Sequence, residues 1–241
     1  MTVTWTIFFC ILNFALPKII LSLYPNFYEK LDERKRRELP SWATGMFHHL
    51  IVAPCGFYMI YRDYITPSEF YSRMDYSRDF WGLHTITYAF GYIMADTIFF
   101  TIPEVLAGKW EYALHHVASL GLYWGLLGAD GAVLRFVPHF MICESSNAIF
   151  NTAFFVRNGG GNDTAFLRHL EKSFGIVFFV LRILHFPVAI HAMLLLPSTM
   201  ALGPWRWVLV PILALQFMWL YYIIKALSKK AKAQAEKDKS K

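Results

Sequence analysis

The sequence predicts an all-α membrane protein, a bundle of about seven transmembrane helices. Hydrophobic residues make up 56% of the 241 residues and charged residues only 17%. With a mean hydropathy of +0.37, this composition leaves too little charge to coat a soluble domain of this size. The chain also holds a series of apolar stretches of about 20 residues, the length at which a helix crosses the hydrocarbon core of a bilayer.

These apolar stretches predict where the helices lie. The expected spans cover residues 3–24, 41–61, 81–102, 110–129, 134–157, 170–195 and 205–224. Four prolines inside them, Pro54, Pro138, Pro187 and Pro211, predict kinks or local unwinding, because proline lacks the N–H and clashes with the preceding turn. The first stretch has neither a basic n-region nor a small-residue cleavage site. We therefore interpret it as a retained span and not as a cleaved signal peptide.

The distribution of lysine and arginine predicts how the chain is oriented. Both are concentrated in the loop after the first span and in the C-terminal tail, and cytosolic loops carry such an excess. We therefore expect a lumenal N-terminus, a first span with a basic cytosolic loop over 1–40, a membrane domain over 41–225 and a lysine-rich cytosolic tail over 226–241. The sequon at Asn162 then falls in a cytosolic loop, and we expect it to stay unmodified.

The end of the tail indicates a location. Residues 237–241 read K-D-K-S-K, which matches the K-x-K-x-x retrieval pattern of endoplasmic reticulum membrane proteins. The alternative is an ordinary solvated lysine tail after a last span. Because the pattern is read only from the cytosol, it agrees with the expected orientation. We predict a multi-pass protein of the endoplasmic reticulum membrane.

Several classes of protein are disfavoured. The cysteines, Cys10, Cys55 and Cys143, lie inside apolar stretches without metal or disulfide spacing, so we interpret them as core thiols and expect no metal or bound cofactor. The basic segments adjoin membrane ends, where anionic lipid headgroups and not nucleic acids are the expected partner. A diiron oxygenase needs clustered H-x-x-H-H repeats, which are absent. A transporter with inverted repeats would show a symmetric pair of half-helices broken by Gly or Pro, and this sequence has no such pair.

Polar side chains recur inside the expected spans, where an ionisable group is costly and normally faces the bundle interior or a wet cavity. In two spans they repeat at helical spacing, so that each set shares one face. These sets are His84, Tyr88, Tyr92 and Asp96 in the third span and Glu144, Asn147 and Asn151 in the fifth. Further pairs are His48 with His49, His115 with His116, and Arg182 with His185. The sequence thus predicts helices that turn polar faces inward.

The depth of these residues suggests what they form. Glu144 and Arg182 both fall near the middle of their spans, so they are candidates for a buried ion pair. Asp96, Asn151 and the histidine pairs fall nearer the cytosolic ends, where they would line one cavity open to the cytosol. The alternative is that these groups only hold helices together, for about 0.6 kcal/mol for each hydrogen bond.

The pair His115 and His116 is the strongest catalytic signal. Neighbouring side chains on a helix point about 100° apart, so one ring can face a reacting atom while the other braces it. A histidine can take a proton from a nucleophile or carry an acyl group, and a carboxylate such as Asp96 or Glu144 would orient its ring. An HH dipeptide alone is a weak signal, as the second pair at His48 shows.

Taken in order, these features resemble the TLC domain, the TRAM, Lag and CLN homology domain of ceramide synthases and TLC domain-containing proteins. The resemblance runs from about residue 42 to residue 225. It rests on the basic first loop and on five elements of the sequence, namely Tyr92 with Asp96, the pair His115 and His116, residues 144–146, Asn151 and Arg182. It implies six helices around a central cavity that receives a fatty acyl chain.

The ceramide synthases of this family transfer an acyl group from acyl-CoA to a sphingoid amine. Their signature starts with two histidines, which correspond to His115 and His116, and continues to an H-D-x-x-D motif. Here residues 143–147 read C-E-S-S-N, so that the histidine and the second aspartate are missing. The chain also has no homeobox-like insert. It therefore resembles the TLC domain-containing branch more than a true ceramide synthase.

Two functions remain open. The first is a lipid acyltransferase that uses acyl-CoA as co-substrate, with His115, His116, Asp96 and Glu144 as catalytic candidates. The side chains expected to bind substrate are Tyr92, Asn147, Asn151 and Arg182. The second is a non-catalytic lipid-binding protein that regulates membrane phospholipid composition, which the altered motif favours. In both cases we expect membrane lipids and fatty acyl chains as partners, with a homodimer as a further candidate.

Overall fold

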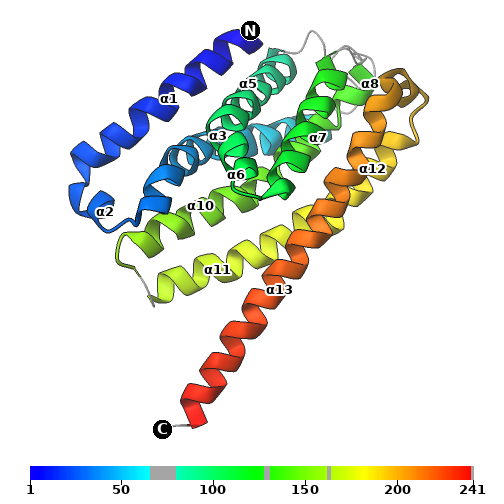
Figure 1. Cartoon of the computed structure of the whole chain (residues 1–241). Helices are drawn as coiled ribbons and strands as arrows, with labels where there is room; N and C mark the ends of the chain where they lie inside the picture. The colour runs from blue at the N-terminus through cyan, green and yellow to red at the C-terminus, as the bar shows by residue number, and fades with distance from the viewer. Residues whose placement is uncertain (66–79, 128–130, 162–163, 240–241) are drawn as a thin grey trace.

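The computed structural model describes residues 1–65, 80–127, 131–161 and 164–239, and nearly all of these are helical (Figure 1). The first part of the chain forms α1 (Thr2–Leu23), α2 (Pro25–Glu29) and α3 (Glu33–Ile65). The middle forms α5 (Phe80–Asp96), η2 (Thr97–Thr101), α6 (Ile102–Leu106), α7 (Trp110–Leu127), α8 (Gly131–Leu134), α9 (Val137–Met141) and α10 (Glu144–Asn158). The last part forms α11 (Ala165–Phe178), η3 (Phe179–His185), α12 (Phe186–Leu194), η4 (Pro197–Val208) and α13 (Leu209–Lys239).

The predicted all-α membrane fold is confirmed. Among the described residues, five helical stretches are long and apolar enough to cross a membrane. They cover Thr2–Leu23, Glu33–Asp63, His84–Leu106, Ala165–Leu194 and Leu202–Lys229. The two other expected spans are a helix of 18 residues, α7, and a segment divided between α9 and α10. The number of seven spans therefore stays a prediction.

At the kink expected near Pro138 the chain forms two helices, separated by Ile142 and Cys143, whose backbone angles stay helical. Pro138 lies in the first turn of the short helix α9, where a missing N–H costs no hydrogen bond, and α10 starts anew at Glu144. A carboxylate in the first turn of a helix also interacts favourably with the helix dipole. The break therefore places Glu144 at the start of a helix, in the middle of the stretch expected to form one span.

Two π-helical segments stand directly before prolines. η2 is followed by Pro103 in the first turn of α6, and η3 is followed by Pro187 in the first turn of α12. Proline cannot donate to the preceding turn and its ring crowds the carbonyl four residues earlier, so a wider turn relieves both problems. The local unwinding predicted at Pro187 is thus observed. By contrast, α3 continues through Pro54, while Pro211 lies in the first turn of α13, directly after the 3-10 segment η4.

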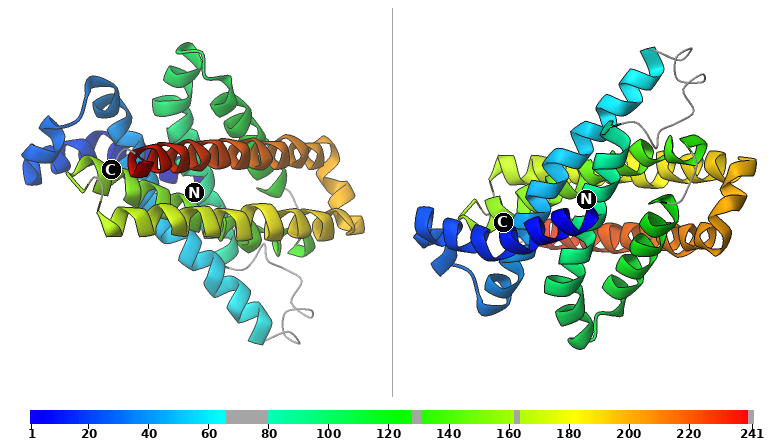
Figure 2. Two further views of the ribbon diagram at one scale, coloured as in Figure 1. Left: turned by 90° about the horizontal axis from the view of Figure 1, so that it is seen from below. Right: turned by 90° about the horizontal axis from the view of Figure 1, so that it is seen from above.

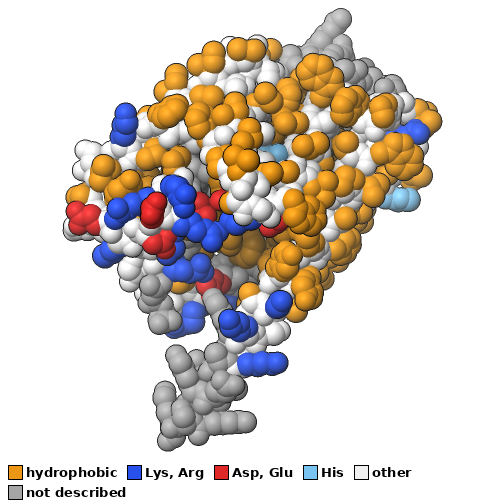
Figure 3. Space-filling view, viewed as in Figure 1, with side chains coloured by type: hydrophobic (Ala, Val, Ile, Leu, Met, Phe, Trp, Pro, Cys, Tyr) orange, Lys and Arg blue, Asp and Glu red, His pale blue; other side chains and the backbone are white. Residues whose placement is uncertain are grey.

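The charged ends are more helical than expected. The basic residues assigned to the first loop, from Arg34 to Arg37, lie in the first turns of α3, and α13 continues through the lysine-rich tail to Lys239. The sequon at Asn162 and the last two residues lie outside the described residues. Figure 3 shows the charged side chains gathered toward one end of the molecule, while hydrophobic side chains cover the rest of this face.

The last helices form a long hairpin on one side of the bundle. The chain runs out through α11, η3 and α12, turns at η4 and returns along α13, which packs against η3 and then diverges from α11 toward the C-terminus (Figure 1 and Figure 2). α1 lies at the opposite edge, packed against α5 and α3. The bundle therefore has an outer helix at one edge and a hairpin at the other.

Tight packing between α1 and α5 depends on Gly91. A Cβ atom at this position would lie 2.5 Å from the Cβ of Trp5 and 2.8 Å from the backbone nitrogen of Thr6. A backbone atom cannot rotate away, so any side chain at Gly91 must push the two helices apart. The ring of Trp5, which packs on Tyr88 in an edge-on contact, would move with α1.

We expect Gly91→Val to lower the free energy of unfolding by about 1–3 kcal/mol, the usual cost of overpacking a core. A thermal melt of the detergent-solubilised protein, followed by fluorescence-detected gel filtration, measures this change. Gly175→Ala on α11 is the matched control, because a Cβ there meets nothing within 4 Å and alanine favours a helix over glycine. Equal melting of the Gly91→Val protein and the wild type would contradict this packing.

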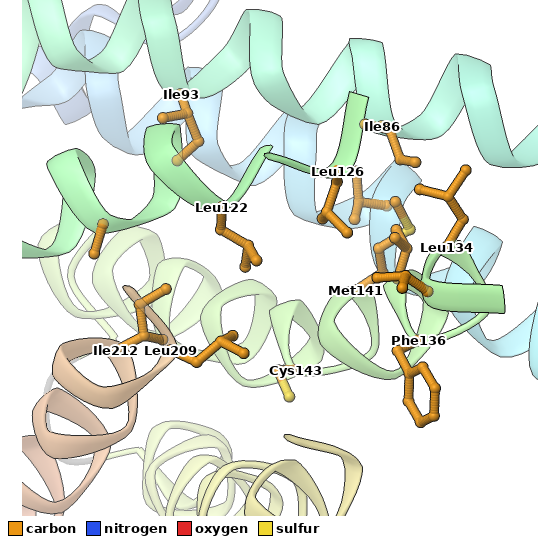
Figure 4. Packing of buried hydrophobic residues seen from close by; sticks show 14 of the residues in the cluster. Ile86, Ile93, Leu122, Leu126, Leu134, Phe136, Met141, Cys143, Leu209 and Ile212 are labelled. Carbon is orange, nitrogen blue, oxygen red and sulfur yellow. The ribbon is translucent and has the colours of Figure 1, made fainter. Parts of the chain in front are cut away.

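The hydrophobic core lies where α5, α7, α9 and α13 meet (Figure 4). Leu122 and Leu126 of α7 pack there with Ile86 of α5 and with Leu209 and Ile212 at the start of α13. All three cysteines are free. Cys143 is part of this core and Cys10 packs against it, as expected of core thiols, while Cys55 is half-buried.

Candidate functional site: an intramembrane cavity

A cavity of about 550 Å³ lies inside the helical bundle, as the family resemblance implies. Its walls come from α3, α5 with η2, α7, α10, α11 with η3, and α13. All of the predicted site residues line it, namely Tyr92, Asp96, His115, His116, Glu144, Asn147, Asn151 and Arg182. At one end the wall includes Arg157 and Leu227, which are partly exposed, and this end coincides with the charged part of the molecule.

His116 is held on both sides of its ring. Its Nε2 lies 3.3 Å from Oδ2 of Asp96, and its Nδ1 lies 3.0 Å from the hydroxyl of Thr97. The Thr97 hydroxyl donates to the carbonyl of Ile93 at 2.6 Å, so it accepts from Nδ1–H of His116. Ser41 donates to the other oxygen of Asp96 at 2.6 Å. Both ring nitrogens of His116 therefore have a partner, Thr97 on one side and Asp96 on the other.

His115 is in a different situation. It is half-buried, its ring lies edge-on to those of His116 and Trp219, and its Nδ1 has no hydrogen-bond partner among the described residues. The two neighbouring histidines are thus divided as the helix geometry predicts. His116 is braced, and Nδ1 of His115 is buried without a hydrogen-bond partner among the described residues.

A second cluster forms around Glu144. Its Oε2 lies 2.8 Å from Nδ1 of His49 and accepts a hydrogen bond from the Asn147 amide at 2.7 Å. Its Oε1 lies 3.7 Å from Nη2 of Arg182, so the predicted ion pair of Glu144 and Arg182 is present. Arg182 itself lies in η3.

Arg182 is fixed by further hydrogen bonds from its guanidinium group. It donates from Nε to Ser146 at 2.9 Å and from Nη1 to Gln216 at 3.1 Å. Both partners are buried, and Gln216 reaches Arg182 from the opposite wall on α13. Residues from α3, α10, η3 and α13 are therefore joined in one polar network at the cavity.

Tyr92 and Asn151 meet at Gly45 of α3. A Cβ at Gly45 would lie 3.1 Å from both the Tyr92 hydroxyl and the Asn151 amide nitrogen, and 3.4 Å from Nε2 of His49. Asn151 also donates to the backbone carbonyl of Trp42 at 3.3 Å. The small residue at position 45 lets three polar atoms from three helices approach one another.

Sequence reasoning left out some members of this site. His49 was recognised as a possible wall residue but not as a partner of Glu144, and Ser41 and Thr97 carried no signal beyond their hydroxyl groups. Gln216 was detectable in principle, because an amide inside the otherwise apolar last span is costly unless it is paired. The identity of its partner, Arg182 on another helix, was not detectable.

Three cavity residues, His48, His49 and Glu144, are close enough to hold a metal ion, with one ligand atom from each within 4.8 Å of the others. The charge balance argues against this reading. Arg182 already compensates the single carboxylate, so a divalent cation would leave excess positive charge buried in the bundle, which is costly. We interpret the group as an acid–base cluster.

A comparison with protein-family models gives a match to the TLC domain (TRAM, LAG1 and CLN8) over residues 38–225. The chain belongs to the TLC domain family. Comparisons with curated proteins and with solved structures give no match. Membership confirms the resemblance predicted from the sequence, and the TLC region contains the residues described at the cavity except Leu227. The catalytic roles of these residues and the division into domains stay predictions.

Proposed function

We propose that this TLC domain protein transfers a fatty acyl group from acyl-CoA to a lipid acceptor inside the cavity. The observation that carries the proposal is the division of the histidine pair, with His116 braced by Asp96 and a ring nitrogen of His115 left without a partner. Family membership supports a role in lipid metabolism. The position of the pair in a cavity within apolar helices supports a lipid substrate.

In the first step, a ring nitrogen of His115 attacks the thioester carbon of acyl-CoA. A C–N bond forms, the C–S bond breaks, and the proton lost from His115 leaves with the thiolate as the free thiol of CoA. His116 lies edge-on to the reacting ring and its contact with Asp96 holds it there, so we assign it the role of positioning His115. Acyl-CoA acts as a co-substrate, and this step uses no resident cofactor.

The cavity offers an apolar part for the acyl chain. Its lining includes Phe174 and Phe178 on the α11 side and Trp219 and Ile223 of α13 on the other. The polar part holds Arg182, with Tyr92, Asn147 and Asn151, which we assign to substrate binding. Such a division fits an amphipathic substrate whose reactive group is polar and whose chain is not.

We place the protein in the endoplasmic reticulum membrane, with a lumenal N-terminus and a cytosolic C-terminus. The lysine-rich tail with its K-x-K-x-x ending supports this location, and the basic residues at the start of α3 support the orientation. The charged end of the molecule, where the cavity reaches Arg157, then faces the cytosol and its acyl-CoA. Membrane lipids and fatty acyl chains are the expected partners, and a homodimer is a further candidate.

A non-catalytic lipid-binding protein is the second candidate function. It is favoured by the replacement of the H-D-x-x-D motif: the first position is Cys143, whose thiol contacts only backbone carbonyls of His139 and Leu181. Asn147, near the last position of the motif, is occupied by its hydrogen bond to Glu144. A cavity whose polar groups satisfy one another could hold a lipid without turning it over.

Acyl transfer by the purified protein separates these functions. The full chain in nanodiscs is given labelled acyl-CoA and a panel of lipid acceptors, beside a His115→Ala, His116→Ala double variant. We expect labelled lipid from the wild type and a loss of transfer to background in the double variant. Lipid bound by both proteins, with no turnover in either, would support the binding function instead.

A further inference from the structure

The cavity contains a second histidine–carboxylate pair, which the first step of the proposed reaction does not use. Nδ1 of His49 lies 2.8 Å from Glu144, and His49 is buried on α3, away from the histidine pair of α7. Arg182 and Asn147 contact the same carboxylate. Glu144 is therefore held in place as an anion that can stabilise a positive charge on His49.

The other nitrogen of His49, Nε2, points to a different group of atoms. It lies near Gly45, together with the Tyr92 hydroxyl and the Asn151 amide. The Asn151 amide has two N–H groups and spends one on the carbonyl of Trp42, so one donor remains. Nε2 of His49 and these two hydrogen-bond donors thus all lie close to Gly45, and no hydrogen-bond partner holds Nε2 among the described residues.

We infer that His49, held by Glu144, is the base that takes the proton from a hydroxyl group of the acceptor lipid. A hydroxyl oxygen can accept from Asn151 or Tyr92 while its O–H donates to Nε2 of His49. A lipid amine would be an ammonium ion at neutral pH and would need a carboxylate. The three carboxylates of the lining, Asp96, Glu144 and Glu171, already have cationic or histidine partners, and Arg182 would repel it. The inference rests on the proposed function, of which it is the second step.

The step balances as follows. The acceptor oxygen attacks the acyl carbon on His115, a C–O bond forms and the C–N bond to His115 breaks. The acceptor proton passes to Nε2 of His49, whose positive charge Glu144 stabilises, and then returns to the ring of His115. The products are the acylated lipid and both histidines in their starting states.

His49→Asn tests this assignment with little disturbance. The asparagine amide nitrogen can occupy the place of Nδ1 and keep the contact with Glu144, but it offers no base in place of Nε2. With labelled acyl-CoA and a long-chain alcohol as acceptor, we expect the first equivalent of CoA thiol to be released as in the wild type. Acyl ester should then form about 100-fold or more slowly, and acylated protein should accumulate.

The matched control is His139→Asn, because His139 contacts His185 outside the cavity and should leave both steps unchanged. An equal-length alkyl amine serves as a second acceptor and should react far more slowly than the alcohol with the wild type. Ester formation at the wild-type rate by His49→Asn, a matching loss of the first thiol release, or preference for the amine would each overturn the inference.

If the wild type releases no thiol and forms no ester, the proposed function fails, and this outcome is distinct from a failure of His49 alone. Glu144→Gln provides a second variant in the event that His49→Asn does not fold. It removes the anion and keeps the shape, and it should slow ester formation more than the first thiol release. An equal effect of Glu144→Gln on both steps would argue against the assignment.

Discussion

Replacing Arg182 with leucine should produce the largest loss of stability among single substitutions at the cavity. Arg182 is buried, and its guanidinium group contacts Glu144, Ser146 and Gln216. Removing it leaves a carboxylate and two polar groups without their partner in a low-dielectric environment. We expect the free energy of unfolding to fall by about 3 kcal/mol, near the lower end for a broken buried ion pair, because Glu144 retains some access to the cavity.

A double-mutant cycle measures how much of this loss belongs to the ion pair. In the Arg182→Leu, Glu144→Gln protein the orphaned charge is gone, so the double variant should be more stable than the sum of the two single changes predicts. Arg168→Leu is the control, since Arg168 lies exposed on α11 and should change stability by less than about 0.5 kcal/mol. Additive effects of the two cavity substitutions would show that the 3.7 Å contact carries no coupling.

Replacing His115 or Asp96, on which the proposed acylation step depends, should have the largest effect on the reaction. We expect His115→Ala to abolish the acylated form of the protein, because the nitrogen that carries the acyl group is gone. Asp96→Asn should still form it, but on the order of 10²–10⁴-fold more slowly, since the amide cannot orient the ring of His116 as the carboxylate does. Intact-mass spectrometry of the protein quenched at set times after addition of acyl-CoA measures both rates.

The control for this pair of variants is Ser119→Ala, a nearby cavity residue of α7 that has no part in the proposed steps. Its acylation should follow the wild type. If His115→Ala is acylated and His116→Ala is not, the roles assigned to the two rings are reversed. If Asp96→Asn loses the adduct completely, Asp96 is needed for the fold of the site and not only for the state of His116.

Much of the fold could be predicted because the bilayer imposes a simple length rule. The ends of the first expected span, residues 3–24, differ from those of α1 by one residue. The rule says less about where a helix continues into water. The run of Glu, Arg and Lys at the start of α3 consists of good helix formers, so its helical state was detectable from propensity. The break before Glu144 was not, because Pro138 alone allows either a kink or a new start.

The sequence predicted which residues share one face of a helix, but not which residues pair between helices. Helical spacing placed Tyr92 and Asp96 on one stripe, and depth suggested that Glu144 meets Arg182. Spacing cannot say which helix lies opposite, so the pairing of Glu144 with His49, between α10 and α3, needed the packed structure. The π-helical turns that present Thr97 and Arg182 also shift the register of a regular helix. A constant rotation of 100° per residue therefore misplaces residues beyond them.

The unbroken course of α13 links the interior of the protein to its far end. Trp219 and Tyr222 form part of the cavity wall, and the same helix continues to Lys239, about 30 Å further at 1.5 Å per residue. A continuous helix behaves as a stiff lever over this distance. A receptor or an anionic headgroup that binds the lysines of this helix would therefore also act on the cavity wall, where we propose that the acyl chain lies.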